Sequence, residues 1–309
     1  MIVLAYDLGG TKVAVGAVDS RGKILDEIRV PVALDQGKAA TLRQLVELGR
    51  EILERNPSIK KAGIGSAGPL DPVAGTLLDP TNFVRNGKRW GKVSLGKILG
   101  AKLGIPVRLD NDAAAAMLAE HWIGAAQGYD NAMILTLGTG LGTGIIANGE
   151  LVRAGRHLHP EDGHFILRAG DKTALCGCGN YGCAEAFLSG GGFGRRARLL
   201  LKDKTLDAKI VAERARAGNA KAKALFREYA ELMAVAIHNY VMAYAPEIVV
   251  FTGSFANASS LFLPDTRKHL AHLLRHKRVG VDMMPKLAVS KLEGQAGLIG
   301  AAVIGMRES

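Results

Sequence analysis

The chain has 309 residues, of which 48% are hydrophobic and 22% are charged, so it can fill the cores of two compact lobes. Its formal net charge is +11, but the basic residues are dispersed and no aromatic residues alternate with them, which argues against a nucleic-acid surface. No segment approaches the length of an apolar membrane span and the first residues do not resemble a signal peptide, so we expect a cytoplasmic protein with no membrane partner.

The N-terminal segment predicts two strands joined by a sharp turn. An apolar run, residues 2–6, meets Asp7-Leu8-Gly9-Gly10-Thr11-Lys12, and an apolar, β-branched run resumes over residues 13–18. Glycines in such a turn let backbone N–H groups approach an anion, Thr11 and Lys12 add donors, and Asp7 can orient Mg²⁺ through water. The alternative is an ordinary hairpin turn, in which Asp and Gly are common.

The next elements prepare a second polar cluster. We expect a strand at residues 28–32, a helix over 41–54 and a buried strand at 61–65. Asp110-Asn111-Asp112 then precedes an alanine-rich helix at 113–120, and one of these three residues is placed to cap it. A carboxylate fixed there can also accept a proton from a substrate hydroxyl, and we expect the helix dipole to lower its pKa.

The second half repeats this order. Residues 133–137 predict a strand, Gly138-Thr139-Gly140-Leu141-Gly142-Thr143-Gly144 a phosphate-binding turn, and residues 145–147 another strand. A helical pattern over 205–244 is interrupted near Gly218, and a strand at 248–251 ends in Thr252-Gly253-Ser254. Two such units predict two α/β lobes with a nucleotide in the cleft between them.

All three cysteines lie within one short stretch. Cys176, Cys178 and Cys183 follow Glu161-Asp162-Gly163-His164, and three thiols with one imidazole make a set typical of a structural zinc site. The alternative is a coincidence of buried thiols. The single residue between Cys176 and Cys178 is tighter than the spacing in DNA-reading fingers, so we predict a zinc-pinned loop.

Together these motifs resemble the ROK family (repressor, open reading frame, kinase) of the actin, Hsp70 and hexokinase superfamily. Further matching segments are residues 64–71, Gly182 to Glu185 and the C-terminal run 293–302. The resemblance implies a two-lobed α/β, actin-like ATPase (ribonuclease H-like) fold with a nucleotide and sugar cleft between the lobes. It implies a small N-terminal lobe, residues 1–113 plus 293–309, and a large lobe with the zinc site, residues 114–292.

The resemblance also implies a set of residues for each ligand, and a homodimer. For the sugar these are Asp112, as the base acting on a hydroxyl, and Asn82, Asn111, Glu161, His164 and Glu185 as ligands. For ATP with Mg²⁺ they are Asp7, Gly9, Gly10, Thr11, Lys12, Gly138, Thr139, Gly140 and Gly253, with Asp7 reaching the metal through water. For structural Zn²⁺ they are His164, Cys176, Cys178 and Cys183, so that His164 ligates zinc with one ring nitrogen and faces the sugar with the other.

The expected activity is therefore transfer of the ATP γ-phosphoryl group to the 6-hydroxyl of a hexose, with glucose as the leading substrate. Fructose, mannose or an N-acetylated hexosamine is an alternative, because His159-Pro160-Glu161 is also similar to fructokinase members. Two other classes stay open. A sugar-responsive repressor needs an added N-terminal DNA-binding domain, whereas the first strand begins at Ile2; a catalytically dead sugar sensor would not need Asp7, Asp112 and both glycine turns.

Overall fold

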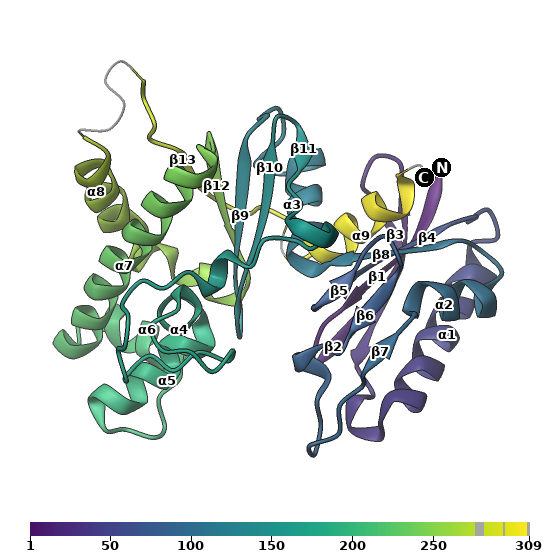
Figure 1. Ribbon diagram of the computed structural model, residues 1–309, viewed down its shortest axis with the longest axis horizontal. Coiled ribbons are helices and arrows are strands. Elements are labelled where there is room, and N and C mark those ends of the chain that lie inside the picture. The colour runs from purple at the N-terminus through teal and green to yellow at the C-terminus, as the bar shows by residue number, and fades with distance from the viewer. Residues whose placement is uncertain (276–280, 293, 308–309) are drawn as a thin grey trace. The chain divides into compact units, whose positions relative to one another are not determined.

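The structure is a computed structural model that describes residues 1–275, 281–292 and 294–307. The chain forms two compact units (Figure 1): unit 1 comprises residues 1–127, 151–160 and 292–309, and unit 2 comprises residues 128–150 and 161–291. Glu293, the first residue of the predicted C-terminal motif and lobe segment, lies outside the described residues. No helix in the described ranges is long and apolar enough to cross a bilayer.

Unit 1 is built on a five-stranded sheet of order β3-β2-β1-β4-β8. The first three strands are antiparallel, whereas β4 and β8 run parallel to β1 and to β4 respectively. The strands are β1 (Ile2–Leu8), β2 (Lys12–Asp19), β3 (Ile24–Pro31), β4 (Ala62–Ser66) and β8 (Val107–Asn111), and β5 (Leu70–Asp71), β6 (Thr76–Leu78) and β7 (Lys92–Val93) form a small separate sheet. The helices are α1 (Lys38–Arg55), α2 (Leu95–Leu103), α3 (Asp112–Ile123) and α9 (Ala296–Met306).

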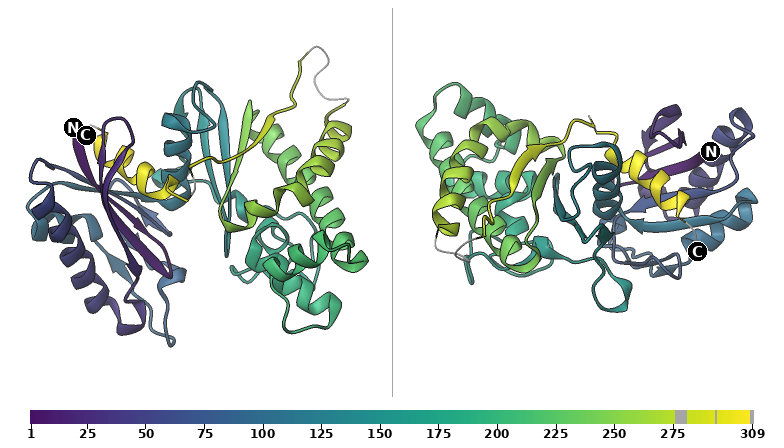
Figure 2. Two further views of the ribbon diagram at one scale, coloured as in Figure 1. Left: turned by 180° about the vertical axis from the view of Figure 1, so that it is seen from behind. Right: turned by 90° about the horizontal axis from the view of Figure 1, so that it is seen from above.

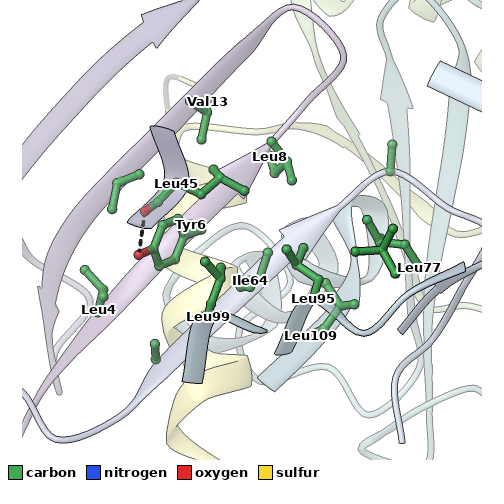
Figure 3. Close-up of a cluster of buried hydrophobic side chains, with 14 of the residues drawn as sticks. Leu4, Tyr6, Leu8, Val13, Leu45, Ile64, Leu77, Leu95, Leu99 and Leu109 are labelled. Carbon is green, nitrogen blue, oxygen red and sulfur yellow. Dashed lines mark hydrogen bonds between the residues drawn. The ribbon is translucent and has the colours of Figure 1, made fainter. Parts of the chain in front are cut away.

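The period of two along β1 separates the two faces of this sheet. Leu4, Tyr6 and Leu8 pack with Leu45 of α1 and Leu99 of α2 into one large core (Figure 3). The Tyr6 hydroxyl, fully buried there, donates a hydrogen bond to the Leu45 carbonyl at 3.2 Å. A buried hydroxyl without such a partner would cost about 1–3 kcal/mol, so this bond fixes how α1 lies on β1.

The opposite face of the sheet carries small residues. Val3 and Ala5 of β1 pack with Leu298 and Ala301 of α9, and a Cβ added to Gly300 would lie 1.8 Å from the Ala115 carbonyl oxygen of α3. α9 and α3 therefore pack backbone to backbone, and the views in Figures 1 and 2 both show them side by side. Any larger residue at this crossing would force the helices apart.

Unit 2 repeats the same sheet, in the order β11-β10-β9-β12-β13. Again two neighbouring strands, β10 and β9, pair antiparallel, and β12 runs parallel to both β9 and β13, which confirms the predicted repeat and the ribonuclease H-like class. The strands are β9 (Ala132–Leu137), β10 (Leu141–Ala147), β11 (Glu150–Leu151), β12 (Ile248–Thr252) and β13 (Lys286–Val289). The helices, gathered on one side of the sheet in Figure 2, are α4 (Ala184–Leu188), α5 (Gly190–Leu201), α6 (Ala208–Arg216), α7 (Ala220–Tyr244) and α8 (Leu263–Leu274).

The predicted break in the long helical pattern is confirmed between α6 and α7. Asp207 caps α6, because its side chain accepts the Ile210 N–H at 2.8 Å. Gly218 adopts φ +92°, a left-handed conformation that stops a helix. Asn219 then caps α7 by accepting the Ala222 N–H at 3.0 Å. Asp207 and Asn219 thus each satisfy an N–H group that the first turn of a helix leaves without a partner.

Two details differ from the sequence expectations. The second glycine turn is shorter than predicted: residues 141–144 belong to β10, because Gly142 and Gly144 pair with Thr136 and Ile134 of β9. The predicted boundary after residue 113 places the rest of α3 and residues 151–160 in the second lobe, whereas the compact unit 1 includes both. The small residues of α3 allow it to pack closely against the small residues of α9, which also belongs to unit 1.

Candidate functional site

The first glycine turn joins β1 to β2 in unit 1. The Gly9 N–H donates to the Lys12 carbonyl at 3.0 Å, which closes the hairpin. For the N–H groups of Gly10 and Thr11 the structure records no hydrogen bond within the described ranges, and the Thr11 and Lys12 side chains are exposed. The hydrogen bond between Gly9 and Lys12 is that of an ordinary hairpin turn. The tip of the turn presents backbone N–H, hydroxyl and ammonium donors, which are groups that bind phosphate.

Asn82 lies against this turn. It belongs to a 3₁₀ helix, Thr81–Phe83, and a Cβ on Gly10 would lie 3.3 Å from its carbonyl oxygen. Arg85 holds the two segments together, because its guanidinium donates to the Gly10 carbonyl at 2.5 Å and to the Asn82 carbonyl at 3.0 Å. Sequence reasoning missed Arg85, since its partner in the turn lies 75 residues away along the chain.

Asp7 and Asp112 are neighbours in unit 1 through Gly65. Asp7 is the second-last residue of β1 and pairs with Gly65 of β4, and a Cβ on Gly65 would lie 3.8 Å from the Asp112 Cα. Burial, and after it the negative charge of Asp112, raises the pKa of Asp7 to about 6. Gly297 of α9 closes the other side, where a Cβ would lie 2.5 Å from Asp7 Oδ2. Only a residue without a side chain leaves Asp7 in this position.

The start of α3 carries both Asn111 and Asp112. Asn111 is the N-cap, and its side-chain oxygen accepts the N–H groups of Ala113 at 2.8 Å and Ala114 at 3.1 Å, as predicted for this segment. Asp112 Oδ1 also accepts the Ala113 N–H at 2.8 Å. The expectation of a lowered pKa for Asp112 is wrong, because burial raises it and outweighs the hydrogen bonds that act in the other direction.

A buried ion pair supports this helix start. Asp110 is 3% exposed, and both terminal nitrogens of Arg153 donate to its carboxylate, one of them at 2.9 Å. Asp110 Oδ1 also accepts the Asn111 N–H at 2.7 Å. The pair therefore fixes the backbone directly before Asp112. Sequence reasoning singled out Asp110 only as a possible cap, and Arg153 not at all.

His159 lies near Asn111 in unit 1. A Cβ on Gly68 would lie 3.7 Å from both His159 Cε1 and the side-chain nitrogen of Asn111. Burial lowers the pKa of His159 to about 4, so its imidazole is neutral at pH 7. A neutral ring both donates and accepts, which suits contact with a hydroxyl or an amide.

The second glycine turn, Gly138-Thr139-Gly140, lies in unit 2 between β9 and β10. The Gly138 carbonyl accepts the Gly190 N–H at the start of α5 at 2.8 Å. Gly253 packs on the strand before the turn with φ +89°, and a Cβ there would lie 2.6 Å from the Leu137 carbonyl oxygen. Gly253 therefore fits only as glycine, both for its backbone conformation and for the space around it.

Four side chains in unit 2 lie together where the sequence predicts a metal centre. The ligand atoms of His164, Cys176, Cys178 and Cys183 all lie within 4.8 Å of one another. Cys178 Sγ and Cys183 Sγ are 3.7 Å apart, and His164 Nδ1 is 3.5 Å from Cys176 Sγ. Bonds of about 2.3 Å to sulfur and about 2.0 Å to nitrogen in a tetrahedron require separations of about 3.8 and 3.6 Å. The residues therefore fit zinc.

The metal cluster lies directly beside the predicted sugar ligands of unit 2. His164 turns Nδ1 toward the thiols, and its Nε2 lies 3.9 Å from Glu161 Oε2. Glu185, in the first turn of α4, accepts the Leu141 N–H with Oε2 at 3.1 Å and lies 3.2 Å from Cys176 Sγ with Oε1. A Cβ on Gly140 would meet Glu185 Oε2 at 2.7 Å, which explains glycine at that position of the turn.

Two tyrosines of α7 hold the backbone between Glu161 and His164. Tyr240 donates a hydrogen bond to the Asp162 carbonyl and Tyr244 to the Asp162 carboxylate, each at 3.1 Å. Asp162 is 2% exposed, and burial raises its pKa to about 6. These anchors were not found from the sequence, because the tyrosines lie 78 and 82 residues away along the chain.

The predicted site residues therefore fall into two groups. Unit 1 brings together the first turn with Asp7, Asn82, Asn111 and Asp112. Unit 2 brings together the second turn and Gly253, and places Glu161, His164 and Glu185 around the cysteines. Each group combines phosphate-type donors with carboxylate, amide or imidazole groups that can bind hydroxyls.

Comparisons with known proteins show relatives over nearly the whole chain. The chain is 30% identical to a glucokinase of Thermotoga maritima over 98% of this chain and 96% of that protein. It is 32% identical to an N-acetyl-D-glucosamine kinase of Escherichia coli O6:H1 over 98% and 99% of the two chains. Among solved structures, a ROK hexokinase from Thermus thermophilus superposes with a TM-score of 0.85 at 31% identity and covers 99% of this chain and 98% of its own.

The family model named ROK family matches residues 3–308, which is nearly the whole sequence. The matched range spans both glycine turns, Asp7, Asp112 and the Cys/His cluster. The chain belongs to the ROK family.

Proposed function

We propose that this chain is an ATP-dependent hexose kinase that transfers the γ-phosphoryl group to the 6-hydroxyl of a hexose, with glucose as the leading substrate. The observation that supports it most is the arrangement of Asp7 and Asp112 around Gly65, next to the first glycine turn. A phosphoryl transferase needs a metal-orienting carboxylate, a phosphate cradle and a base close together. ROK relatives named as glucokinases and N-acetylglucosamine kinases support the same class of reaction.

In the proposed reaction Asp112 accepts the proton of the sugar 6-hydroxyl. A bond forms between that oxygen and the γ-phosphorus, and the bond from phosphorus to the bridging oxygen breaks, so that ADP leaves with the electron pair. Burial raises the pKa of Asp112, which makes it a stronger base than an exposed aspartate. Transfer through a loose transition state needs mainly positioning, which the Asn111 cap and the Arg153–Asp110 pair supply at this helix start.

We assign Gly10, Thr11 and Lys12 of unit 1 and Thr139 and Gly140 of unit 2 to the ATP phosphates. Asp7 orients Mg²⁺, which when bound shields the charge that the phosphates carry. Gly253, which packs on the strand that precedes the second turn, is assigned to ATP as a backbone contact. A solved ROK glucokinase from Streptomyces griseus, 29% identical over 99% of each chain with a TM-score of 0.80, carries glucose and AMPPNP.

The remaining sugar hydroxyls are assigned to Asn82, Asn111, Glu161, His164 and Glu185. Zinc, when bound by His164 Nδ1 and the three thiolates, fixes the ring of His164 and leaves Nε2 for a hydroxyl. Asp162, hydrogen-bonded to Tyr244, keeps the backbone of this segment in place. Substrate choice among hexoses rests on how these groups and His159 meet the substituent at the second carbon of the sugar.

The experiment that tests the proposal is a coupled assay of ADP release with glucose, mannose, fructose, N-acetylglucosamine and N-acetylmannosamine, with ³¹P NMR to locate the new phosphate ester. The expected result is a 6-phosphate product and the highest kcat/KM with glucose. A higher kcat/KM with an N-acetylated hexosamine would move the assignment to that substrate. Saturable sugar binding with no ADP release for any sugar would reject the kinase and favour a sensor.

A further inference from the structure

Arg85 connects the first glycine turn to Asn82 with one guanidinium. Its terminal nitrogens donate to the Gly10 carbonyl at 2.5 Å and to the Asn82 carbonyl at 3.0 Å. Gly10 also packs on Asn82 directly, because a Cβ on Gly10 would lie 3.5 Å from the Asn82 Cβ. Gly10 is assigned to the ATP phosphates and Asn82 to the sugar. One side chain therefore joins a residue of each ligand set, and all three residues belong to unit 1.

The donors of Arg85 are directed mainly at backbone carbonyls. The nitrogen that holds Asn82 also donates to the Val84 carbonyl at 2.9 Å, and Nε forms an ion pair with Asp35 at 3.1 Å. The Asp35 side chain is 85% exposed, so this pair is screened by water and contributes little. The three carbonyls and Asp35 use four of the five N–H donors of an arginine. Arg85 therefore acts on ligands through the backbone that it holds.

The bond to Gly10 also fixes the direction of the Thr11 N–H. The Gly10 carbonyl and the Thr11 N–H belong to one planar, trans peptide group, so they point in opposite directions. Thr11 is assigned to the ATP phosphates, and its N–H lies at the tip of the turn. A guanidinium on the carbonyl side polarises this peptide group and makes its N–H a stronger donor. Without Arg85 the peptide group would lose both its direction and this polarisation.

The loop that carries Arg85 has anchors of its own. Phe83 is fully buried, and its ring packs on Trp90 with the ring centroids 4.9 Å apart. Arg85 and Lys88 exchange backbone hydrogen bonds across a two-residue turn, at 3.3 and 2.8 Å. A substitution of the Arg85 side chain therefore removes the link to the glycine turn and leaves the aromatic anchor and the hairpin in place.

We infer that Arg85 is a positioning residue that couples the binding of nucleotide to the binding of sugar. A phosphate at the Thr11 N–H favours the peptide orientation that Arg85 also favours, and the same guanidinium then holds Asn82 where it meets the sugar. Each ligand thus reduces the ordering that the other requires, and by linkage the two strengthen each other by the same factor. This inference rests on the proposed function, from which the ligands of Gly10, Thr11 and Asn82 are taken.

The coupling is tested by calorimetry with glucose, without nucleotide and with saturating Mg²⁺ and a non-hydrolysable ATP analogue. In wild type the analogue is expected to lower the Kd for glucose about fivefold or more, the lower end of the usual range for coupled sites. In Arg85→Ala and Arg85→Lys this factor is expected to fall to near one, because lysine keeps the charge but has no planar fork with which to hold both carbonyls. Lys88→Ala removes an exposed cation of the same hairpin; as the matched control it keeps the wild-type factor.

Each outcome of the calorimetry decides the role of Arg85. A factor near one in wild type, or an unchanged factor in both Arg85 variants, overturns the coupling. So does weaker binding of both ligands with an unchanged factor, which would leave Arg85 a structural role only. A factor that survives in Arg85→Lys but not in Arg85→Ala would assign the effect to charge and overturn the role of the two carbonyl bonds. Titration of the analogue with and without glucose must give the same factor.

Amide hydrogen exchange of the ligand-free chain tests the link without either substrate. Arg85→Lys is expected to exchange faster than wild type in residues 8–13 and 79–90, the two segments that the guanidinium joins, whereas Lys88→Ala should match wild type in residues 8–13. Equal exchange of residues 8–13 in Arg85→Lys and wild type overturns the link, whatever the chain binds. Cooperative binding of both ligands without ADP release overturns the proposed kinase and leaves the coupling through Arg85 established.

Discussion

Glu185 Oε2 accepts a hydrogen bond from the backbone N–H of Leu141 at 3.1 Å. The other oxygen of the same carboxylate lies 3.2 Å from Cys176 Sγ. One side chain thus contacts both the end of the second glycine turn and a ligand of the metal cluster. A disturbance of the cluster is therefore expected to reach residues assigned to the sugar and to the phosphates.

Removal of the metal is the first prediction. The wild-type chain is expected to purify with about one zinc per chain, because the four ligand atoms match a tetrahedral site. His164→Gln and Cys178→Ser are expected to lose the zinc and to raise the KM for sugar about 10–100-fold, the range seen when groups around a metal are lost. Metal analysis and steady-state kinetics measure both effects.

The matched control is His269→Gln, an exposed histidine on α8, which should keep the zinc and the KM. Full zinc content in Cys178→Ser would contradict the ligand assignment. Loss of zinc with an unchanged KM for sugar would separate the metal from the sugar ligands.

The second prediction concerns the proposed base. Asp112→Asn keeps the size of the side chain and can still accept the Ala113 N–H, which Asp112 accepts at 2.8 Å, but it cannot take a proton. The kcat is expected to fall about 10²–10⁴-fold, with the Kd for sugar nearly unchanged. Asp265→Asn, on the surface of α8, controls for the loss of a charge. Turnover near the wild-type value in Asp112→Asn would falsify the assignment of the base.

The third prediction is a dependence on pH. Asp112 must be ionised to accept a proton, and burial raises its pKa above the ordinary value, so kcat/KM is expected to fall with decreasing pH earlier than for an exposed aspartate. Burial also raises the pKa of Asp7 to about 6, and bound Mg²⁺ favours the ionised form of Asp7. Profiles of kcat/KM against pH at low and at saturating Mg²⁺ distinguish the titration of Asp112 from that of Asp7. A fall in rate whose midpoint pH changes with the Mg²⁺ concentration belongs to Asp7.

An acid limb that stays at the same pH in Asp112→Asn would show that another group controls the rate. Because the folded state holds these carboxylates with raised pKa values, each also destabilises the fold as the pH rises through that value. Activity and stability should therefore respond to pH in opposite directions over this interval.

The sequence predicted those parts of the molecule that depend on local patterns. Alternating apolar residues define the strands of both sheets, and Gly218 with Asn219 marks the break between α6 and α7. The cysteine spacing predicted a cluster that the structure brings together. The predicted second turn was too long. Glycine occurs both in turns and in strands, so the sequence alone does not show that Gly142 and Gly144 belong to β10; their pairing with β9 shows it.

Contacts between distant segments could not be predicted from single residues. Arg85 and Gly10, or Tyr244 and Asp162, have no pattern that links them along the chain. The raised pKa of Asp112 depends on burial beneath other elements, whereas the sequence reveals only the helix that follows it. The sugar specificity, the homodimer and the assignment of individual ligands stay predictions, since they depend on groups that meet only when substrate or a second chain is bound.

The last prediction uses Gly297 at the start of α9. A methyl group at this position would lie 2.5 Å from Asp7 Oδ2 and 2.6 Å from Asp7 Cγ, closer than atoms can approach, so Asp7 must move or α9 must shift. Gly297→Ala is expected to lower the free energy of unfolding by about 1–3 kcal/mol, the usual cost of overpacking. It should also raise the Mg²⁺ concentration needed for half-maximal turnover, because the displaced Asp7 carboxylate no longer has the position from which it orients the metal.

Gly155→Ala is the matched control, since no atom lies within 4 Å of a Cβ built there. It should leave both quantities unchanged, as measured by chemical unfolding and by Mg²⁺ titration of the rate. A loss of stability in Gly297→Ala without a change in the Mg²⁺ requirement would mean that α9 yields and Asp7 does not. The glycine would then serve the packing of the helix, and the link between the C-terminal motif and the metal-orienting carboxylate would be refuted.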